Sequence, residues 1–168
     1  LKRDRNLKSF MDISKGIGRI FIPTQAEIHL PVERDYVYIQ DFVPNNNYDI
    51  RIIIIGQRAF AIKRMARKDD FRASGSGQIV YDPEQIPRAC IENAFSISRK
   101  LKFQCMAYDY IFQETEPMLV EISYAFSSKA YLPCPGYWRE DMRWMKYNPG
   151  LEYFMLEDFG INPQEKTL

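Results

Sequence analysis

The chain has 168 residues, of which 46% are hydrophobic and 27% are charged, and its formal net charge is +1. This length and composition fit one globular domain, and the balanced charge argues against a nucleic-acid partner, which usually requires a basic surface. Three scattered cysteines and one histidine exclude a zinc site or a Ser-His hydrolase, and favour reduced thiols in a cytoplasmic protein. The longest apolar run, residues 52–55, is too short to span a membrane.

Residues 1–35 have a mixed pattern and form a lead-in that we leave unassigned. The next segment, residues 36–43, alternates in a way that predicts a strand with one aromatic face, made of Tyr36, Tyr38, Gln40 and Phe42. An aromatic face of this kind is typical both of a surface that covers a purine and of a core strand capped by tyrosines.

A β-hairpin is predicted at residues 49–64. Residues 49–55 and 58–64 have strand composition, and Gly56 and Gln57 form a two-residue turn with glycine at its first central position. The consecutive isoleucines at 52–55 indicate burial on both faces. Arg51 and Lys63 are then cations in a mostly buried sheet, which is unfavourable unless anions are bound there.

A loop follows at residues 67–77, with Arg72 just before an Ala-Ser-Gly-Ser-Gly run. Glycine and serine allow backbone amides to approach an anion closely, and Arg72 offers a planar fork of donors for oxygen atoms. The same composition is also typical of a plain flexible connection between a strand and a helix.

Helical patterns are predicted at residues 82–102 and 151–159. In the first, the apolar stripe consists of Cys90, Ala94, Ile97 and Leu101, and Pro87 is placed in the first turn. The second ends at Gly160 and is followed by Pro163. Hairpins followed by helices predict an α+β fold with a mostly antiparallel sheet and flanking helices.

A second hairpin is predicted at residues 106–123, and it carries the most informative pair of side chains. Strands at 106–112 and 118–123, joined by a turn at 113–117, fold about Thr115, so that Asp109 lies opposite Glu121 with Cβ atoms about 5 Å apart. Two carboxylates at this separation are destabilising unless a cation lies between them, and oxygen ligands favour Mg²⁺. Ser123 points the same way and adds a third oxygen. The alternative is two solvated acids on an outer face.

Five stretches, in this order and spacing, resemble the ATP-grasp carboxylate-amine ligases, in particular a branch associated with sugar and surface-polysaccharide biosynthesis. They lie between residues 36 and 138, at residues 38–44, 48–51, 61–64, 71–77 and 120–124. The resemblance implies that ATP and Mg²⁺ are used to phosphorylate a small-molecule or sugar-linked carboxylate. An amine or another nucleophile then attacks the acyl phosphate.

The resemblance also implies roles for individual residues. The hinge strand that holds the nucleotide comprises Gln40, Asp41, Phe42 and Val43, with Asp41 near the ribose. The cofactor-binding set continues with Asp49, Arg51 and Lys63, the last two on phosphate oxygens. Lys63 and Arg72 are the implied catalytic residues, with Arg72 at the transferred phosphoryl group.

For the metal, the resemblance implies Asp109 and Glu121 as ligands of Mg²⁺, with Ser123 where most of the superfamily has asparagine. Because ATP-grasp ligases are generally near twice this length, the 168 residues are interpreted as one domain from the C-terminal part of a longer protein. The alternatives are a catalytically inactive nucleotide-binding module of the same fold and a plain interaction domain. A homodimer is compatible with the sequence.

Overall fold

The computed structural model describes residues 37, 39–67, 73, 75 and 77–162. The chain divides into two compact units, residues 1–41 and 42–168, and the helices and strands below belong to the second. None of the described helices is long and apolar enough to cross a membrane.

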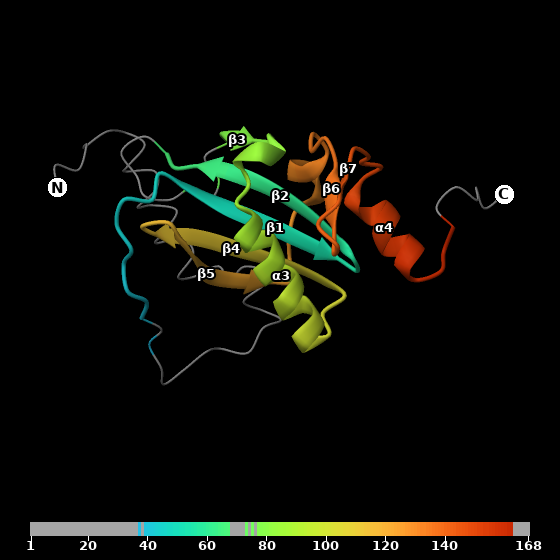
Figure 1. Ribbon diagram of the computed structural model, residues 1–168, viewed down its shortest axis with the longest axis horizontal. Helices are drawn as coiled ribbons and strands as arrows, with labels where there is room; N and C mark the ends of the chain where they lie inside the picture. The colour runs from blue at the N-terminus through green and yellow to red at the C-terminus, as the bar shows by residue number, and fades with distance from the viewer. Residues whose placement is uncertain (1–36, 38, 68–72, 74, 76, 163–168) are drawn as a thin grey trace, which may run out of the picture. The chain divides into compact units, whose positions relative to one another are not determined.

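An antiparallel sheet organises the second unit (Figure 1). Seven strands are found in the described part of the chain, in the order β5-β4-β1-β2-β6-β7, with β3 paired to β2. The α+β fold with a mostly antiparallel sheet is therefore confirmed. The strands are β1 (Tyr48–Ile55), β2 (Arg58–Met65), β3 (Ile79–Val80), β4 (Cys105–Gln113), β5 (Glu116–Ser123), β6 (Tyr137–Arg139) and β7 (Trp144–Met145).

The first hairpin forms as predicted. Ile55 pairs with Arg58 across the Gly56–Gln57 turn, and Gly56 has a positive φ of 54°. Glycine is also needed here for space, because a Cβ atom at this position would lie 2.3 Å from the Asp158 Oδ2 atom. The turn of the hairpin is thus in close contact with a residue about a hundred positions later.

The second hairpin has the predicted pairing of Asp109 with Glu121, but its turn and its register differ from the prediction. The turn is shorter than expected, because Gln113 already pairs with Glu116, and this shifts the pairs next to the turn by one residue. An irregularity between Asp109 and Tyr110 leaves Val120 as an extra residue in β5, which restores the register. Asp109 therefore pairs with Glu121, as predicted from the sequence.

Helix α3 (Arg88–Leu101) lies against one face of the sheet (Figure 1). The single helical segment predicted at 82–102 is wrong at its start, because a short 3-10 helix, η1 (Pro83–Gln85), precedes it and Pro87 is the N-cap. Proline restrains the residue before it to extended backbone, and Ile86 accordingly has φ −96° and ψ 115°. Of the predicted stripe, Leu101 is 51% exposed, and the buried residues are Cys90, Ile91, Ala94, Phe95 and Ser98.

Helix α4 (Leu151–Asp158) packs on the opposite face, as the buried side chains of Leu151 and Phe154 show. It agrees with the predicted terminal helix, and Gly160 follows it with a φ of 74°. The predicted Pro163 stop lies outside the described residues. Before this helix, the 3-10 helix η2 (Ser128–Tyr131) contributes Tyr131 to the same core.

The strand predicted at 36–43 does not form at its described positions, residues 37 and 39–43. Val37 and Ile39 are 83% and 82% exposed, and no described ladder pairs with this segment. A strand is held by hydrogen bonds to a neighbouring strand and by burial of one face. At the described positions the backbone is not in a strand and Val37 and Ile39 are exposed, so alternation of residue types was not sufficient.

Candidate functional site

Five charged side chains gather on the α4 face of the sheet, on neighbouring strands. The pairs Asp49–Arg64, Arg51–Asp109 and Asp109–Glu121 lie directly opposite each other across β2, β1, β4 and β5. Opposite residues in antiparallel strands share a face, so backbone register alone brings these side chains together. We call Asp49, Arg51, Arg64, Asp109 and Glu121 the ionic cluster.

Arg64 lies at the centre of the ionic cluster and is only 7% exposed. Its Nε and Nη2 atoms donate to the two carboxylate oxygens of Asp49, each at 2.7 Å. Nη2 also donates to Asp109 Oδ2 at 3.0 Å. Such a bidentate arrangement fixes the guanidinium plane, which an isolated lysine ammonium does not achieve.

Arg51 lies between the two carboxylates that the sequence placed face to face. Its Nε donates to Asp109 Oδ1 at 2.6 Å, and its Nη2 lies 3.8 Å from Glu121 Oε1. The side chain of Asp109 is 9% exposed and that of Glu121 is 59% exposed. Mg²⁺ was predicted between the two acids, and in the structure the Arg51 guanidinium contacts both of them.

Burial and charge act against each other at the centre of the ionic cluster. Burial raises the pKa of Asp49, and the Arg64 guanidinium opposes this rise only in part. Burial alone would lower the pKa of Arg64, but hydrogen bonds and charges from Asp49 and Asp109 outweigh it, so this pKa is above its ordinary value. Arg64 is therefore a permanent cation. With all groups ionised, three carboxylates face two guanidiniums, an excess of one negative charge.

A pocket of about 270 Å³ opens beside the ionic cluster. Its lining includes Arg51, Ile62, Arg64, Gly75, Gly77 and Tyr131. Gly75 and Gly77 have positive φ angles of 71° and 75°, so two glycines of the predicted anion loop adopt backbone conformations that other residues rarely reach. Small-molecule sites commonly measure about 300–1,000 Å³, so this pocket suits one charged group better than a whole nucleotide.

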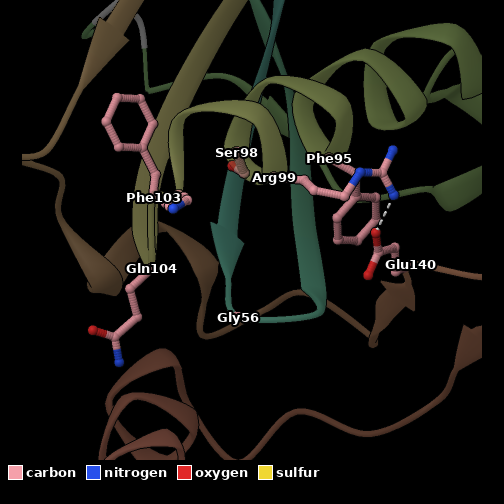
Figure 2. A pocket seen from close by; sticks show the side chains of 8 residues that line it. Gly56, Phe95, Ser98, Arg99, Phe103, Gln104 and Glu140 are labelled. Carbon is pink, nitrogen blue, oxygen red and sulfur yellow. Dashed lines mark hydrogen bonds and ion pairs between the residues drawn. The ribbon is translucent and has the colours of Figure 1, made fainter.

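A second pocket of about 270 Å³ lies at the other end of the first hairpin (Figure 2). It is bounded by Gly56 in the turn and by Phe95 and Arg99 on α3. Figure 2 shows Arg99 joined to Glu140, and their Nη1–Oε1 distance is 2.6 Å. This pocket lies on the α3 side of the sheet, away from Asp109 and Glu121, so it is a weaker candidate for a site that binds phosphate together with a metal.

Lys63 does not join the ionic cluster, although we expected it to line the same cleft as Arg51. Arg51 pairs with Ile62, so Lys63, the next residue, points to the α3 face. There its Nζ lies 4.2 Å from the ring centroid of Tyr48 and 3.2 Å from Gln85 Oε1. The expectation that Lys63 shares a cleft with Arg51 is therefore wrong.

The remaining predicted site residues are placed as follows. Ser123 pairs with Ala107 on the same face as Glu121, and its Oγ donates to the Ala125 carbonyl at 3.0 Å. The segment predicted to bind the nucleotide is exposed at Gln40, Asp41 and Phe42 and half-buried at Val43. Gln40 and Asp41 belong to the first unit, so their position relative to the ionic cluster is not defined. Arg72 lies outside the described residues.

Arg64 was missed by the sequence reasoning, although a signal for it was present. The Gly56–Gln57 turn fixes the register of the first hairpin, and in that register Arg64 lies opposite Asp49. Counting along β2 in steps of two from the buried Phe60 reaches Ile62 and then Arg64 on one face. The same count places Lys63 on the other face.

Magnesium is the metal that the predicted ligands imply, and its fit to the ionic cluster is partial. Within the described residues, no group of three His, Cys, Asp or Glu side chains is arranged to hold a metal alone. Mg²⁺ is often held by only one or two carboxylates, with substrate phosphates and water completing the shell. Asp109, Glu121 and the excess negative charge meet that requirement, while both Asp109 oxygens already accept hydrogen bonds from arginines.

Comparison with known families identifies the domain. Residues 11–130 match the RimK-like ATP-grasp domain, and the chain belongs to that family. Membership indicates an ATP-dependent ligase and an ATP-binding fold. The comparison with curated proteins finds no match.

Proposed function

We propose that this chain carries the catalytic part of an ATP- and Mg²⁺-dependent ligase that activates a carboxylate as an acyl phosphate. The observation that carries the proposal is the ionic cluster. It aligns Asp109 and Glu121 on one face and presents Arg51 and Arg64 to a pocket lined by two glycines. The proposed second step is attack on the acyl phosphate by an amine or another nucleophile.

Charge placement accounts for the chemistry of such a site. Phosphoryl transfer needs positioning and neutralisation of developing charge more than it needs a protein nucleophile. Arg51 and Arg64 are held by carboxylates in fixed orientations, so little reorganisation is required when an anion arrives. Arg72 is proposed, from the family resemblance, to contact the transferred phosphoryl group. Mg²⁺, when bound by Asp109 and Glu121, supplies further neutralisation, and Ser123 is a proposed additional ligand.

The remaining elements of the proposal rest on the resemblance. Gln40, Asp41, Phe42 and Val43 are proposed to contact the nucleotide, and Asp49 acts by orienting Arg64. A sugar-linked carboxylate in surface-polysaccharide biosynthesis is the proposed substrate class, with the reaction in the cytoplasm. The proposal includes no nucleic-acid partner, and a homodimer is compatible with it.

A second candidate is a nucleotide-binding module without catalysis. The observation that favours it is that both carboxylate oxygens of Asp109 accept hydrogen bonds from Arg51 and Arg64, which compete with a metal for the same oxygens. A module of this kind binds nucleotide and never forms an acyl phosphate, which gives the two candidates different experimental outcomes.

Hydroxylamine trapping separates the two candidates. The full-length protein is incubated with ATP, Mg²⁺, hydroxylamine and a panel of sugar-linked and small carboxylates, and hydroxamate is measured. We expect ATP-dependent hydroxamate with one carboxylate class, lost in Glu121→Gln and retained in the control Glu116→Gln, an exposed acid on the same strand. If magnesium-ADP raises the melting temperature but no carboxylate in the panel gives hydroxamate, the result favours the inactive module. No thermal shift at millimolar magnesium-ADP would contradict both candidates.

A further inference from the structure

Tyr131 has a buried hydroxyl that no described residue satisfies. The side chain belongs to η2, is 2% exposed, and packs in the core on the α4 face. Among the described residues none donates to or accepts from its hydroxyl group. Buried polar groups nearly always have a partner, so such a group indicates a missing ligand or water.

The position of Tyr131 points to a ligand in the arginine pocket. Tyr131 lines that pocket together with Arg51 and Arg64. Burial, the largest cause, and the Asp109 charge raise the pKa of Tyr131, while both arginines lower it, and the net pKa is well above the ordinary value. The hydroxyl therefore keeps its proton at neutral pH and can donate a hydrogen bond.

The backbone around Tyr131 is fixed by hydrogen bonds to two consecutive carbonyl groups, and this restricts the position of the ring. The carbonyl of Tyr131 accepts from Asn148 Nδ2 at 2.8 Å, and the preceding carbonyl of Ala130 accepts from the Tyr81 hydroxyl at 3.0 Å. A donor fixed before the ligand arrives loses little conformational entropy on binding. The unsatisfied hydroxyl is thus preorganised.

We propose that the Tyr131 hydroxyl donates a hydrogen bond to an oxygen of the phosphoryl group bound between Arg51 and Arg64. This inference rests on the proposed ligase function and adds a ligand contact to its site. Contacts with described residues use Nε and Nη2 of Arg51 and of Arg64 and leave Nη1 of each for a ligand. Three donors then match the three terminal oxygens of a phosphoryl group, whereas a carboxylate offers two.

The residue lies just outside the part of the chain that the family comparison covers, since that match ends at residue 130. Family membership therefore assigns no role to Tyr131. Its role is positioning and recognition of the anion, because it carries no charge at neutral pH.

The test replaces Tyr131 with phenylalanine, which removes the hydroxyl and keeps the ring. Affinities for inorganic phosphate and for the magnesium complex of the β,γ-imido analogue of ATP are measured by calorimetry on the full-length protein. We expect about a tenfold to hundredfold loss of affinity for both probes, the size of one hydrogen bond to a charged group. The urea unfolding midpoint of the free protein should stay the same or rise, because the lost hydroxyl has no partner there.

A matched control is Tyr108→Phe. Tyr108 is as deeply buried, but its hydroxyl is bonded to Ser98 on the α3 face, away from the pocket. We expect this variant to lose stability and to keep both affinities. This pattern is the reverse of that expected for Tyr131→Phe, so a merely structural role for Tyr131 would be recognised.

The outcomes separate this inference from the proposed function. Wild-type binding that is abolished in Arg51→Lys but unchanged in Tyr131→Phe would overturn the Tyr131 contact and leave the ligase proposal standing. Tight binding of acetate in place of phosphate would overturn the phosphoryl assignment. If the wild type binds neither phosphate probe, both proposals are overturned. A marked loss of stability in Tyr131→Phe would show that the hydroxyl has a hydrogen-bond partner within the protein, which would overturn the proposed contact.

Discussion

The two faces of the sheet are built from the same strands and differ in what they bury. The α3 face is apolar along β1, where Ile50, Ile52 and Ile54 are fully buried. On the α4 face, Ile53 and Ile55 are buried at one end of the same strand, while Asp49 and Arg51 lie at the other. One strand therefore contributes to a continuous core on one side and to a charged site on the other.

Alternate residues of the same strand therefore have different roles. Those on the α3 face contribute mainly to stability, and those at one end of the α4 face form the candidate site. Apolar burial on the α3 face stabilises the fold by about 25 cal/mol for each Å² removed from water. On the α4 face, buried ions gain little net stability because desolvation offsets their attraction. The ionic cluster is accordingly a costly arrangement, and the adjoining pocket gives a reason for it.

The largest expected effect comes from breaking the centre of the ionic cluster. Arg64→Ala leaves the carboxylates of Asp49 and Asp109 buried without their principal partner. We expect a loss of about 3–5 kcal/mol in the free energy of unfolding, measured by urea denaturation.

The control for this variant is Arg99→Ala, which removes an arginine whose side chain is 69% exposed from its ion pair with Glu140. An exposed pair contributes at most about 1 kcal/mol. Equal losses of unfolding free energy in the two variants would mean that breaking the buried ionic cluster destabilises the protein no more than breaking an exposed ion pair.

A smaller effect tests whether the two faces exclude water equally. Burial raises the pKa of Cys90 on the α3 face and of Cys134 on the α4 face to about 12. The ordinary thiol value is 9.0, so between pH 9 and about 12 the unfolded chain loses protons that the folded chain keeps. Stability should therefore fall as pH rises through that window, by about 1.4 kcal/mol per unit for each thiol.

Urea midpoints measured from pH 8 to pH 10.5 check this, with Cys90→Ala and Cys134→Ala as separate variants. Each should flatten the slope above pH 9 by a similar amount. A slope that changes in only one variant would show that one face admits water and the other does not.

The smallest effect concerns Lys63, the cation on the α3 face. Lys63→Met removes its contact with the Tyr48 ring, which is worth about 0.5–1 kcal/mol at an accessible site. We expect a stability change of that size and unchanged affinity for magnesium-ADP, measured by calorimetry. A large loss of nucleotide affinity would show that Lys63 contacts the phosphates. The α3 face would then take part in nucleotide binding, contrary to the difference between the two faces described above.

The sequence was sufficient to predict the elements whose local signals agree with their tertiary setting. Both hairpins follow from turn residues and two-residue alternation, and helix α4 follows from its helical pattern and the glycine after it. The pairing of Asp109 with Glu121 was predicted correctly only because the shorter turn and the bulge at Val120 cancel each other. The strand composition of 49–55 is reinforced by burial on both faces, so local preference and packing point the same way.

Other features depend on context that residue patterns do not contain. The short strands β6 and β7 have two or three residues each and are held by pairing with distant partners. The segment at 36–43 has the alternation of a strand, but its described positions, residues 37 and 39–43, do not form one. For Arg64 the sequence does contain the signal, because the register set by the Gly56–Gln57 turn places Arg64 opposite Asp49 and Lys63 on the other face.

The extra residue in β5 links two sites that a sequence alignment would treat separately. The tight turn at 114–115 shifts the strand by one residue, and the bulge at Val120 shifts it back before Glu121 is reached. A two-residue turn without a bulge needs an even number of residues between two paired positions, and the bulge at Val120 accommodates the odd residue between Asp109 and Glu121. Among related chains, a hairpin with a three-residue turn should therefore keep the acidic pair without a bulge, provided that the same number of residues separates the two acids.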